Sequence, residues 1–519
     1  MERRSDESAV ASAPTGSTRS GRPARASFVL LLVAIPVYLS LAAGTAHSLR
    51  PWFDEGQHAA PAWSLAFRGS MGTPCLVAPA LKDINRYTYW IMPVDPLIQV
   101  AWYRVFSFGL TSMRALSVLC GLIGLLAWAS VFRYLTKDIA GTFLFLVVMA
   151  CDYVSLTGAA SGRPDIMALA FQAGAFAAYL RWREVNLALA ILLSQSLVVA
   201  SGLTHPNGGM LSFLGALWLT LYFDRKRIRA LHIGLAVLPY LVGAVAWGFY
   251  IAQDPSAFAS QYGFQISERS HIFWNPWKAL RSEFTMRYIP MMGLGGHSPG
   301  SAGPHFLKSL IFVAYGVSIA GLLLNRPLRQ QTATRVVIGF IALDFLFLTL
   351  LEGNKATYYF IYAVYPISAA LVLFSRWCWR SFKRGPLLVA CSLAGLLAVQ
   401  IGGDVFRIRR DAWHKEFMPA VAFMQARARP GDLIVGSHEL GFFLGYGDSF
   451  VDDGMLGLDT GRTPSYIFLE EIYNLRFDAI RERQPREYAR LEDRLKDYQV
   501  IYNQTNYRVL ALHSGAGRK

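Results

Sequence analysis

Charged side chains are scarce in this chain, since Asp, Glu, Lys and Arg together make up only 16% of its 519 residues. Hydrophobic residues account for 54%, and the mean hydropathy is +0.32. A soluble chain of this length could not bury so much apolar surface. The composition therefore excludes a soluble protein and predicts a polytopic α-helical membrane protein.

Cysteine is also rare, with five residues in the whole chain. Cys75 falls in a probable external loop, whereas Cys120, Cys151, Cys378 and Cys391 lie within apolar segments. An odd number of cysteines without a CxxC pair excludes a disulfide framework and a cysteine-based metal site. We interpret all five as small hydrophobic residues.

Acidic residues are fewer than basic ones, 34 against 50, which gives a net charge of +16. A large basic excess can indicate a nucleic-acid-binding protein. Here the basic residues form small clusters between apolar runs, a pattern typical of topology signals and of contacts with anionic lipids. Nucleic acid is therefore not expected as a partner, and membrane lipid is.

Long apolar runs recur as far as residue 403, and about 20 apolar residues suffice to cross a bilayer as a helix. By length we expect about eleven membrane-spanning helices. They are at 27–49, 114–135, 139–158, 165–181, 187–204, 208–224, 231–252, 306–325, 336–351, 358–375 and 386–403. Residues 1–26 are expected to be a disordered cytoplasmic tail, and 27–49 an uncleaved anchor.

The basic clusters fall on alternate connections, and such clusters favour the cytoplasmic side. With the N-terminus inside, clusters such as 225–229 are cytoplasmic, and the short outer connections hold only Arg163 and Lys355. An odd number of spans then places the C-terminus outside, together with two long external loops, 50–113 and 253–305.

Two stretches of the first external loop, 57–68 and 95–110, have helical spacing but are too short to span, so they are predicted to lie along the membrane surface. Residues 27–403 then form a transmembrane domain, and 404–519 a small extracytoplasmic α/β domain. The expected elements of the second domain are a helix at 413–427, a strand at 433–436, helical structure over 466–494, and strands at 500–502 and 507–510.

An acidic pair, Asp54 and Glu55, follows directly on the first span. Adjacent carboxylates beside a membrane span are costly to place. They are either a solvated helix-cap pair or a catalytic pair that meets a lipid-linked substrate. The second interpretation is favoured because other unusual polar residues are expected on the same side. These are Arg163 and Asp165, His205, the histidines His271, His297 and His305, and Lys355 with Tyr358 and Tyr359.

Transfer of a group from a lipid phosphate needs such a set of residues. A carboxylate can take the proton of an acceptor hydroxyl within hydrogen-bond reach. Arg and Lys neutralise the phosphate that leaves.

Several motifs, in this order, resemble those of the GT-C superfamily of membrane glycosyltransferases. They are Phe53-Asp54-Glu55, Asp95-Pro96-Leu97, the run Ser112 to Leu122, Gly162-Arg163-Pro164-Asp165, and Lys355-Ala356-Thr357-Tyr358-Tyr359. The resemblance covers roughly residues 27–375. It is to the branch that contains protein O-mannosyltransferases, aminoarabinose transferases of lipid A and Rgt-like bacterial enzymes. Where that branch frequently has His-Pro-Pro-Leu, this chain has Val94-Asp95-Pro96-Leu97.

The resemblance implies an inverting glycosyltransferase that moves a sugar from a polyprenyl-phosphate donor to a glycan, lipid or protein acceptor. The reaction would take place at the outer face of the cytoplasmic membrane. By analogy, Asp54 would be the base or would position the acceptor, and Glu55 would assist it or bind a metal. The 27–403 region would then be the catalytic domain. The substrate-binding residues are Arg163 and Lys355 on the donor phosphate, Asp165 as the partner of Arg163, and Tyr358, His205 and His58.

Some relatives use a divalent metal ion. In this chain Glu55 with His297 or His58 would supply ligands, although no metal-ligand spacing is present, so metal dependence stays open. The glycine-rich loop 253–305 is expected to be either a mobile lid over the donor or an ordinary surface loop.

A transporter or flippase of lipid-linked sugars is the alternative. Such a protein should have ionisable residues near the middle of the membrane and internal repeats. Interior charges are few here, Asp344 being the clearest, and no duplicated halves are evident. A receptor-like or structural protein would leave the acidic pair and the Arg-Pro-Asp motif unexplained.

Overall fold

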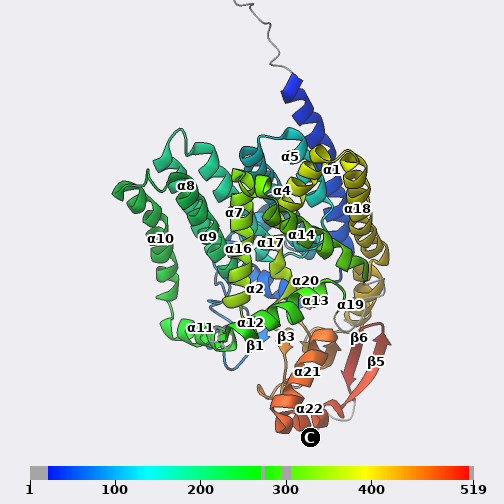
Figure 1. The fold of residues 1–519 in the computed structure, drawn as a ribbon. Helices are drawn as coiled ribbons and strands as arrows, with labels where there is room; N and C mark the ends of the chain where they lie inside the picture. Colours follow the sequence, from blue (N-terminus) through cyan, green and yellow to red (C-terminus); the bar gives the residue numbers. More distant parts are fainter. Residues whose placement is uncertain (1–21, 270–274, 295–305, 514–519) are drawn as a thin grey trace, which may run out of the picture.

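A computed structural model describes residues 22–269, 275–294 and 306–513 (Figure 1). A body of long helices carries, at one end, a smaller region of strands and short helices formed by the C-terminal part of the chain. Residues 1–21 of the predicted tail lie outside the described residues, and the first helix already begins at Arg22.

Every predicted span coincides with helical structure. The helices are α1 Arg22–Ser48, α4 Leu110–Thr136, α5 Ile139–Ala150 with α6 Tyr153–Ala160, α7 Pro164–Trp182, α8 Leu187–Gly202, α9 Pro206–Asp224, α10 Ala230–Ile251, α14 Phe306–Leu324, α16 Thr332–Leu350, α17 Ile361–Ser381 and α18 Gly385–Arg410. Among the described residues six of these helices are long and apolar enough to cross a membrane, or up to seven crossings if α5 and α6 count as one. The total of eleven and the orientation stay predictions.

The span expected at 139–158 is not one straight helix. α5 and α6 meet at 58°, and Asp152 lies at the break. Its side chain accepts hydrogen bonds from the backbone nitrogens of Val154, at 3.0 Å, and Ser155, at 2.9 Å. This N-cap begins a second helix, because it satisfies backbone donors that a continuous helix would use internally.

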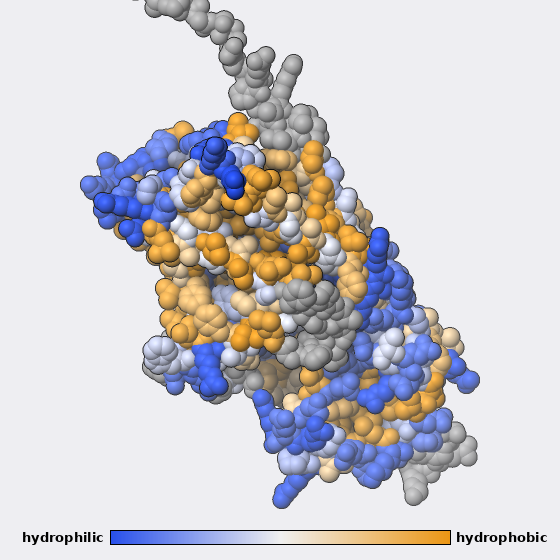
Figure 2. Space-filling model, turned by 45° about the vertical axis from the view of Figure 1, so that its right-hand side comes forward, coloured by the Kyte–Doolittle hydropathy of each residue, from blue (hydrophilic) through white to orange (hydrophobic). Residues whose placement is uncertain are grey.

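The core of the body lies between α4, α7, α8 and α17, where the apolar side chains are buried. α10 stands at the edge of the body (Figure 1), and Pro239 and Gly243 are its only buried residues. Figure 2 shows hydrophobic residues gathered over the helical body and hydrophilic residues over the C-terminal region and the opposite end. This distribution is that of a multi-pass membrane protein.

The two stretches predicted to lie along the membrane surface are helical. α2 Phe53–Arg68 and α3 Val94–Phe106 are both too short to span. The second external loop also contains helices rather than a continuous flexible segment: α11 Pro255–Arg269, α12 Pro276–Ser282, the π-helix η2 Glu283–Tyr288 and α13 Ile289–Met291. The glycines predicted to make this loop a lid lie mostly within 295–305, outside the described residues.

The C-terminal region, residues 411–512, contains five strands of a six-stranded sheet with the order β1-β3-β2-β4-β6-β5. These strands are β2 Ile434–Val435, β3 Phe450–Asp453, β4 Tyr466–Leu469, β5 Tyr498–Gln504 and β6 Tyr507–Leu512. The remaining strand, β1 Leu76–Val77, comes from the first external loop and pairs in parallel with β3. No sequence pattern predicted this pairing.

Two predictions for this region need adjustment. Residues 466–469 form strand β4, and the helical structure begins only at α21 Glu471–Arg483, followed by α22 Pro485–Leu495. The apolar run is a strand because it lies buried in the sheet between β2 and β6. The helix expected at 413–427 consists of a π-helical turn, η4 Trp413–Phe417, and α19 Met418–Gln425.

Candidate active site

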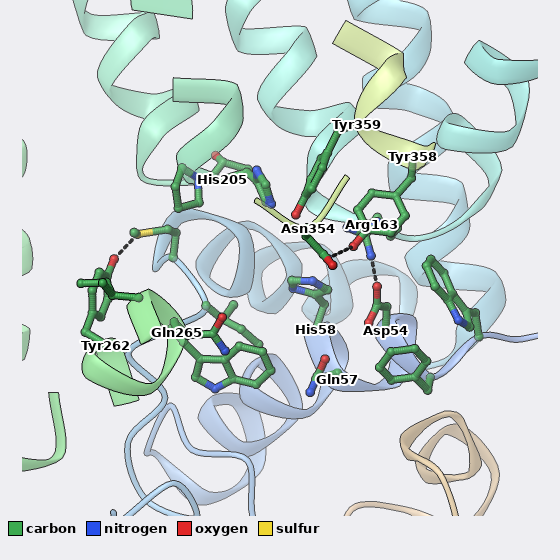
Figure 3. Close-up of a pocket in the computed structure, with 18 of the residues that line it drawn as sticks. Asp54, Gln57, His58, Arg163, His205, Tyr262, Gln265, Asn354, Tyr358 and Tyr359 are labelled. Atoms are coloured by element: carbon green, nitrogen blue, oxygen red, sulfur yellow. Dashed lines mark hydrogen bonds and ion pairs between the residues drawn. The ribbon is translucent and has the colours of Figure 1, made fainter. Parts of the chain in front are cut away.

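A pocket of about 490 Å³ opens where the N-terminus of α2 faces the N-termini of α7 and α9 (Figure 3). We call it the Asp54 pocket. Side chains from both external loops and from three connections line it, and most of them are aromatic or polar. They are Trp52, Phe53, Asp54, Gln57, His58, Trp90, Ile91, Met92, Arg163, Thr204, His205, Pro206, Tyr262, Gln265, Ile266, Leu351, Asn354, Tyr358 and Tyr359.

Asp54 and Arg163 form an ion pair in this pocket (Figure 3). Asp54 stands in the first turn of α2, and Arg163 is the residue before α7, where Pro164 begins the helix. The Nε of Arg163 also donates to Asp165, at 2.9 Å. The positive charge of Arg163 is therefore shared by two carboxylates, although its side chain is only 5% exposed.

Aromatic rings cover the guanidinium of Arg163. Its central carbon lies 3.6 Å from the ring centre of Tyr358 and 5.3 Å from that of Trp52. Asn354 donates to the hydroxyl of Tyr358 at 3.4 Å. A cation stacked on rings is held in place without its hydrogen-bonding edge being fully used. Arg163 is thus fixed in position and keeps donors for an anion.

Two histidines of the pocket lie near buried carboxylates. His58 Nδ1 is 3.8 Å from Asp95, and His205 Nε2 is 3.7 Å from Asp165. Burial lowers the pKa of His58 to about 4, and burial raises the pKa of Asp95 to about 7. At neutral pH His58 is therefore an uncharged imidazole, which can donate and accept hydrogen bonds with sugar hydroxyls.

Asp95 was not assigned a role from the sequence. It stands in the first turn of α3, at the first proline of the His-Pro-Pro-Leu motif that is frequent in the branch the sequence resembles, where this chain has Val94-Asp95-Pro96-Leu97. Gln99, one turn along α3, donates to it at 3.0 Å. The departure from the motif was the available signal, because it placed an acidic residue on a helix that, like α2, was predicted to lie along the membrane surface.

Glu55 does not line the pocket. Both of its carboxylate oxygens accept from Arg114, each at 2.7 Å, and the two side chains are each 1% exposed. Arg114 also donates to the carbonyl of Ala46 at 2.6 Å and to that of Leu49 at 2.9 Å, at the end of α1. The neighbours Asp54 and Glu55 therefore have different surroundings. Asp54 lies in the pocket, whereas Glu55 and Arg114 form a buried ion pair that connects α1, α2 and α4.

Lys355 also lies away from the pocket surface. Its ammonium group is 3.3 Å from Glu283 and donates to the carbonyls of Leu348 and Thr349, each at 2.6 Å. Burial lowers the pKa of Lys355, although the charge of Glu283 opposes this.

Glu283 shares its charge with Arg287, which in turn donates to Glu352 at 2.6 Å. These residues join the second external loop to the connection between α16 and α17, which supplies Asn354 and Tyr358 to the pocket.

Within the described residues no group of three His, Cys, Asp or Glu side chains could hold a metal ion. Glu55 is bound by Arg114, and His58 faces Asp95 rather than Glu55. His297, the other predicted ligand, lies outside the described residues, as do His271 and His305.

Comparison with known proteins was made on sequence and on structure. No protein-family model and no curated protein sequence matches the chain. The structure is similar to that of ArnT from Cupriavidus metallidurans bound to undecaprenyl phosphate. The TM-score is 0.61 at 13% identity, and the match covers 96% of this chain and 100% of ArnT.

The structure is also similar to the Archaeoglobus fulgidus oligosaccharyltransferase in the apo form. That match has a TM-score of 0.53 at 12% identity and covers 96% of this chain and 76% of the archaeal one. The archaeal enzyme AglB in complex with an inhibitory peptide and a dolichol-phosphate gives a TM-score of 0.51 at 12% identity, with 95% and 75% covered. ArnT fits the branch that the sequence motifs indicated, and the chain has the fold of the GT-C superfamily of membrane glycosyltransferases.

Proposed function

We propose that this protein is an inverting glycosyltransferase that uses a polyprenyl-phosphate-linked sugar as donor. The observation that carries the proposal is the ion pair of Asp54 with Arg163 inside a pocket walled by aromatic rings. In such an enzyme the base and the phosphate-binding cation act on opposite faces of one anomeric carbon, so both must line the same pocket. The similarity to ArnT bound to undecaprenyl phosphate supports the same class of donor.

In the proposed reaction the donor phosphate competes for the guanidinium of Arg163. The donor releases Asp54 from its ion pair, and the carboxylate can then accept a proton. The oxygen of the acceptor hydroxyl forms a bond to the anomeric carbon on the face opposite the phosphate. The bond from that carbon to the phosphate oxygen breaks, the proton passes to Asp54, and polyprenyl phosphate leaves on Arg163.

The other pocket residues suit a sugar. Trp52, Trp90 and Tyr358 supply aromatic faces, and the uncharged His58 with His205 supplies polar groups for hydroxyls. Gln265 and Tyr262 of α11 add contacts from the second external loop (Figure 3). Glycan, lipid and protein acceptors all remain candidates.

Glu55 and Lys355 take different roles in this proposal from those suggested by analogy. Glu55 holds Arg114 and so fixes the start of α2, which carries Asp54. Lys355 holds the connection that supplies Asn354 and Tyr358. Both are positioning residues, and no step of the proposed reaction needs a metal ion.

The proposed reaction takes place at the outer face of the cytoplasmic membrane. This rests on the distribution of positive charge, since the basic clusters predicted to be cytoplasmic lie on the connections that do not contribute to the pocket. Reporters fused after residues 56, 163, 206 and 355 should all be external.

A transfer assay tests the function. Membranes containing the protein are incubated with a panel of labelled polyprenyl-phosphate sugars, and both loss of donor and movement of label are measured. We expect one donor to be consumed by the wild type and by Asp493→Asn, whose side chain is 80% exposed on α22, but not by Asp54→Asn. Movement of intact donor across the bilayer without any sugar transfer would instead identify a flippase.

A further inference from the structure

The C-terminal region encloses the side of α2 that faces away from the Asp54 pocket. The backbone of His438, in the 3-10 turn η5 His438–Leu440, lies directly against Gly56. A Cβ atom at position 56 would overlap the carbonyl group of His438. Tyr446 donates to the carbonyl oxygen of Gly56 at 3.0 Å. Two main chains that are some 380 residues apart in sequence thus touch two residues beyond Asp54.

Glycine within a helix is unfavourable relative to alanine, because its backbone loses more conformational freedom. At Gly56 the absence of a side chain is what allows η5 to approach the helix. An isolated helix of 16 residues, the length of α2, is marginal in water and depends on tertiary packing. The packing that α2 has on this side comes from the C-terminal region.

The same region holds the chain before and after α2. Before the helix, Arg50 pairs with Glu471 of α21 at 2.8 Å. After it, the backbone nitrogen of Asp452 donates to the carbonyl of Cys75 at 2.7 Å, and β1 then pairs with β3. The C-terminal region also contacts the buried Glu55–Arg114 pair, since the ring centre of Trp413 lies 5.2 Å from the guanidinium carbon of Arg114.

The buried residue Asp452 connects the contact at Gly56 with the contact at Cys75. The carboxylate of Asp452 binds the imidazole of His438, whose backbone touches Gly56, while its own backbone binds Cys75. Arg476 and Tyr473 of α21 complete the shell of this carboxylate, with Tyr473 donating at 3.0 Å. The side chains of His438 and Asp452 are fully buried. A buried, multiply bonded charge of this kind fixes geometry, because its partners have no favourable alternative.

We propose that the C-terminal region is a positioning part of the catalytic centre: through His438 and Asp452 it fixes α2 so that Asp54 faces Arg163. The inference rests on the proposed function, since it assigns the region a role in that reaction. Misplacement of a reacting group by about 1 Å can lower a rate on the order of a hundredfold. A rigid support behind the base is therefore required for transfer, even though no residue of the C-terminal region lines the pocket in the described part of the chain.

The test compares glycine-to-alanine substitutions in the full-length protein. Gly56→Ala forces α2 away from His438. Gly234→Ala is the neutral control, because a Cβ there meets nothing within 4 Å. Gly339→Ala is the control for general destabilisation, because its Cβ would overlap the ring of Trp218 between α16 and α9. Thermal unfolding, hydrogen exchange of residues 53–68 and donor consumption are measured for each.

We expect Gly56→Ala to raise hydrogen exchange in 53–68 and to lower donor consumption on the order of a hundredfold. Gly339→Ala should lower the unfolding temperature but change neither the hydrogen exchange of residues 53–68 nor donor consumption. If Gly56→Ala does not fold, Tyr446→Phe removes only the hydrogen bond to Gly56 and should shift both readouts in the same direction by a smaller factor.

Unchanged exchange in 53–68, or a loosened α2 with normal donor consumption, would overturn the inference. Hydrogen exchange needs no substrate, so it tests the positioning role of the C-terminal region independently of the proposed glycosyltransferase function. A wild type that consumes no donor would contradict the proposed function, whereas the exchange data would still show whether the C-terminal region holds α2.

Discussion

Arg114 holds both carboxylate oxygens of Glu55 at 2.7 Å, while the adjacent Asp54 turns into the pocket and pairs with Arg163. Successive side chains on a helix point about 100° apart, so two neighbouring acids can serve different purposes. One neutralises a buried arginine, and the other is available to a substrate. The predictions below depend on this division.

Asp54→Asn should lower transfer by at least about a hundredfold, because the amide cannot accept the acceptor proton. Expression should remain close to that of the wild type, because Arg163 keeps its second carboxylate, Asp165. Donor consumption in membranes, normalised to protein amount, is the measurement. Near-normal activity in this variant would remove Asp54 from the role of base.

Glu55→Gln should act on stability. It leaves Arg114 charged, 1% exposed and without its ionic partner, and breaking a buried pair in this way costs about 3–5 kcal/mol. Thermal unfolding in detergent measures the loss, with Glu487→Gln on α22, whose side chain is 36% exposed, as the control. A variant of normal stability without activity would argue instead that Glu55 takes part in the reaction.

Arg163→Ala should raise the KM for the donor by roughly tenfold to a hundredfold, which is the range for a lost hydrogen bond to a charged group. Arg163→Lys should recover only part of this, since lysine keeps the charge but not the planar pair of donors. Initial rates at varied donor concentration measure both. The exposed Arg481→Ala is the matched control, and a donor KM unchanged in Arg163→Ala would exclude the phosphate contact.

Lys355→Met should lower stability more than donor affinity. The substitution removes one of the two cations that neutralise the buried Glu283, so the cost is about 3 kcal/mol. Thermal unfolding and donor KM are measured together. A rise in donor KM as large as that of Arg163→Ala, at normal stability, would instead indicate that Lys355 binds the donor phosphate.

The pair His58 and Asp95 predicts a pH dependence of stability. The pKa of Asp95 is raised to about 7, so its contribution is present at low pH and is lost as the pH rises towards 7. The pKa of His58 is lowered to about 4, so its contribution is present above its ordinary value and is lost as the pH falls towards 4. In the wild type the two contributions to stability therefore change with pH in opposite directions.

Asp95→Asn removes the pH dependence that Asp95 contributes to stability and leaves that of His58. The amide resembles the protonated acid at every pH, so the variant should gain roughly 3 kcal/mol on the wild type between pH 5 and pH 7. Denaturation at a series of pH values measures the difference. A difference that stays constant over this range would mean that Asp95 ionises at its ordinary pH.

The sequence allowed the helical body to be predicted because a bilayer imposes one length and one polarity on each span. Helical structure occupies all the predicted spans, and α2 and α3 are short because their apolar runs are short. The proximity of Asp54 and Arg163 was also predictable, since topology placed both at one face and both begin a helix. The break at Asp152 was not, because a local N-cap interrupts an otherwise continuous apolar run.

The positions of the helices in the body could be predicted from the amino-acid sequence, because they follow from local polarity and length. The contacts of Glu55 with Arg114, of Lys355 with Glu283 and of β1 with β3 became apparent in the folded chain. Those contacts link segments distant in the chain, and each depends on how whole helices pack. Residue type alone made Lys355 equally suited to a phosphate and to a buried carboxylate, and the packing around Glu283 selected the second.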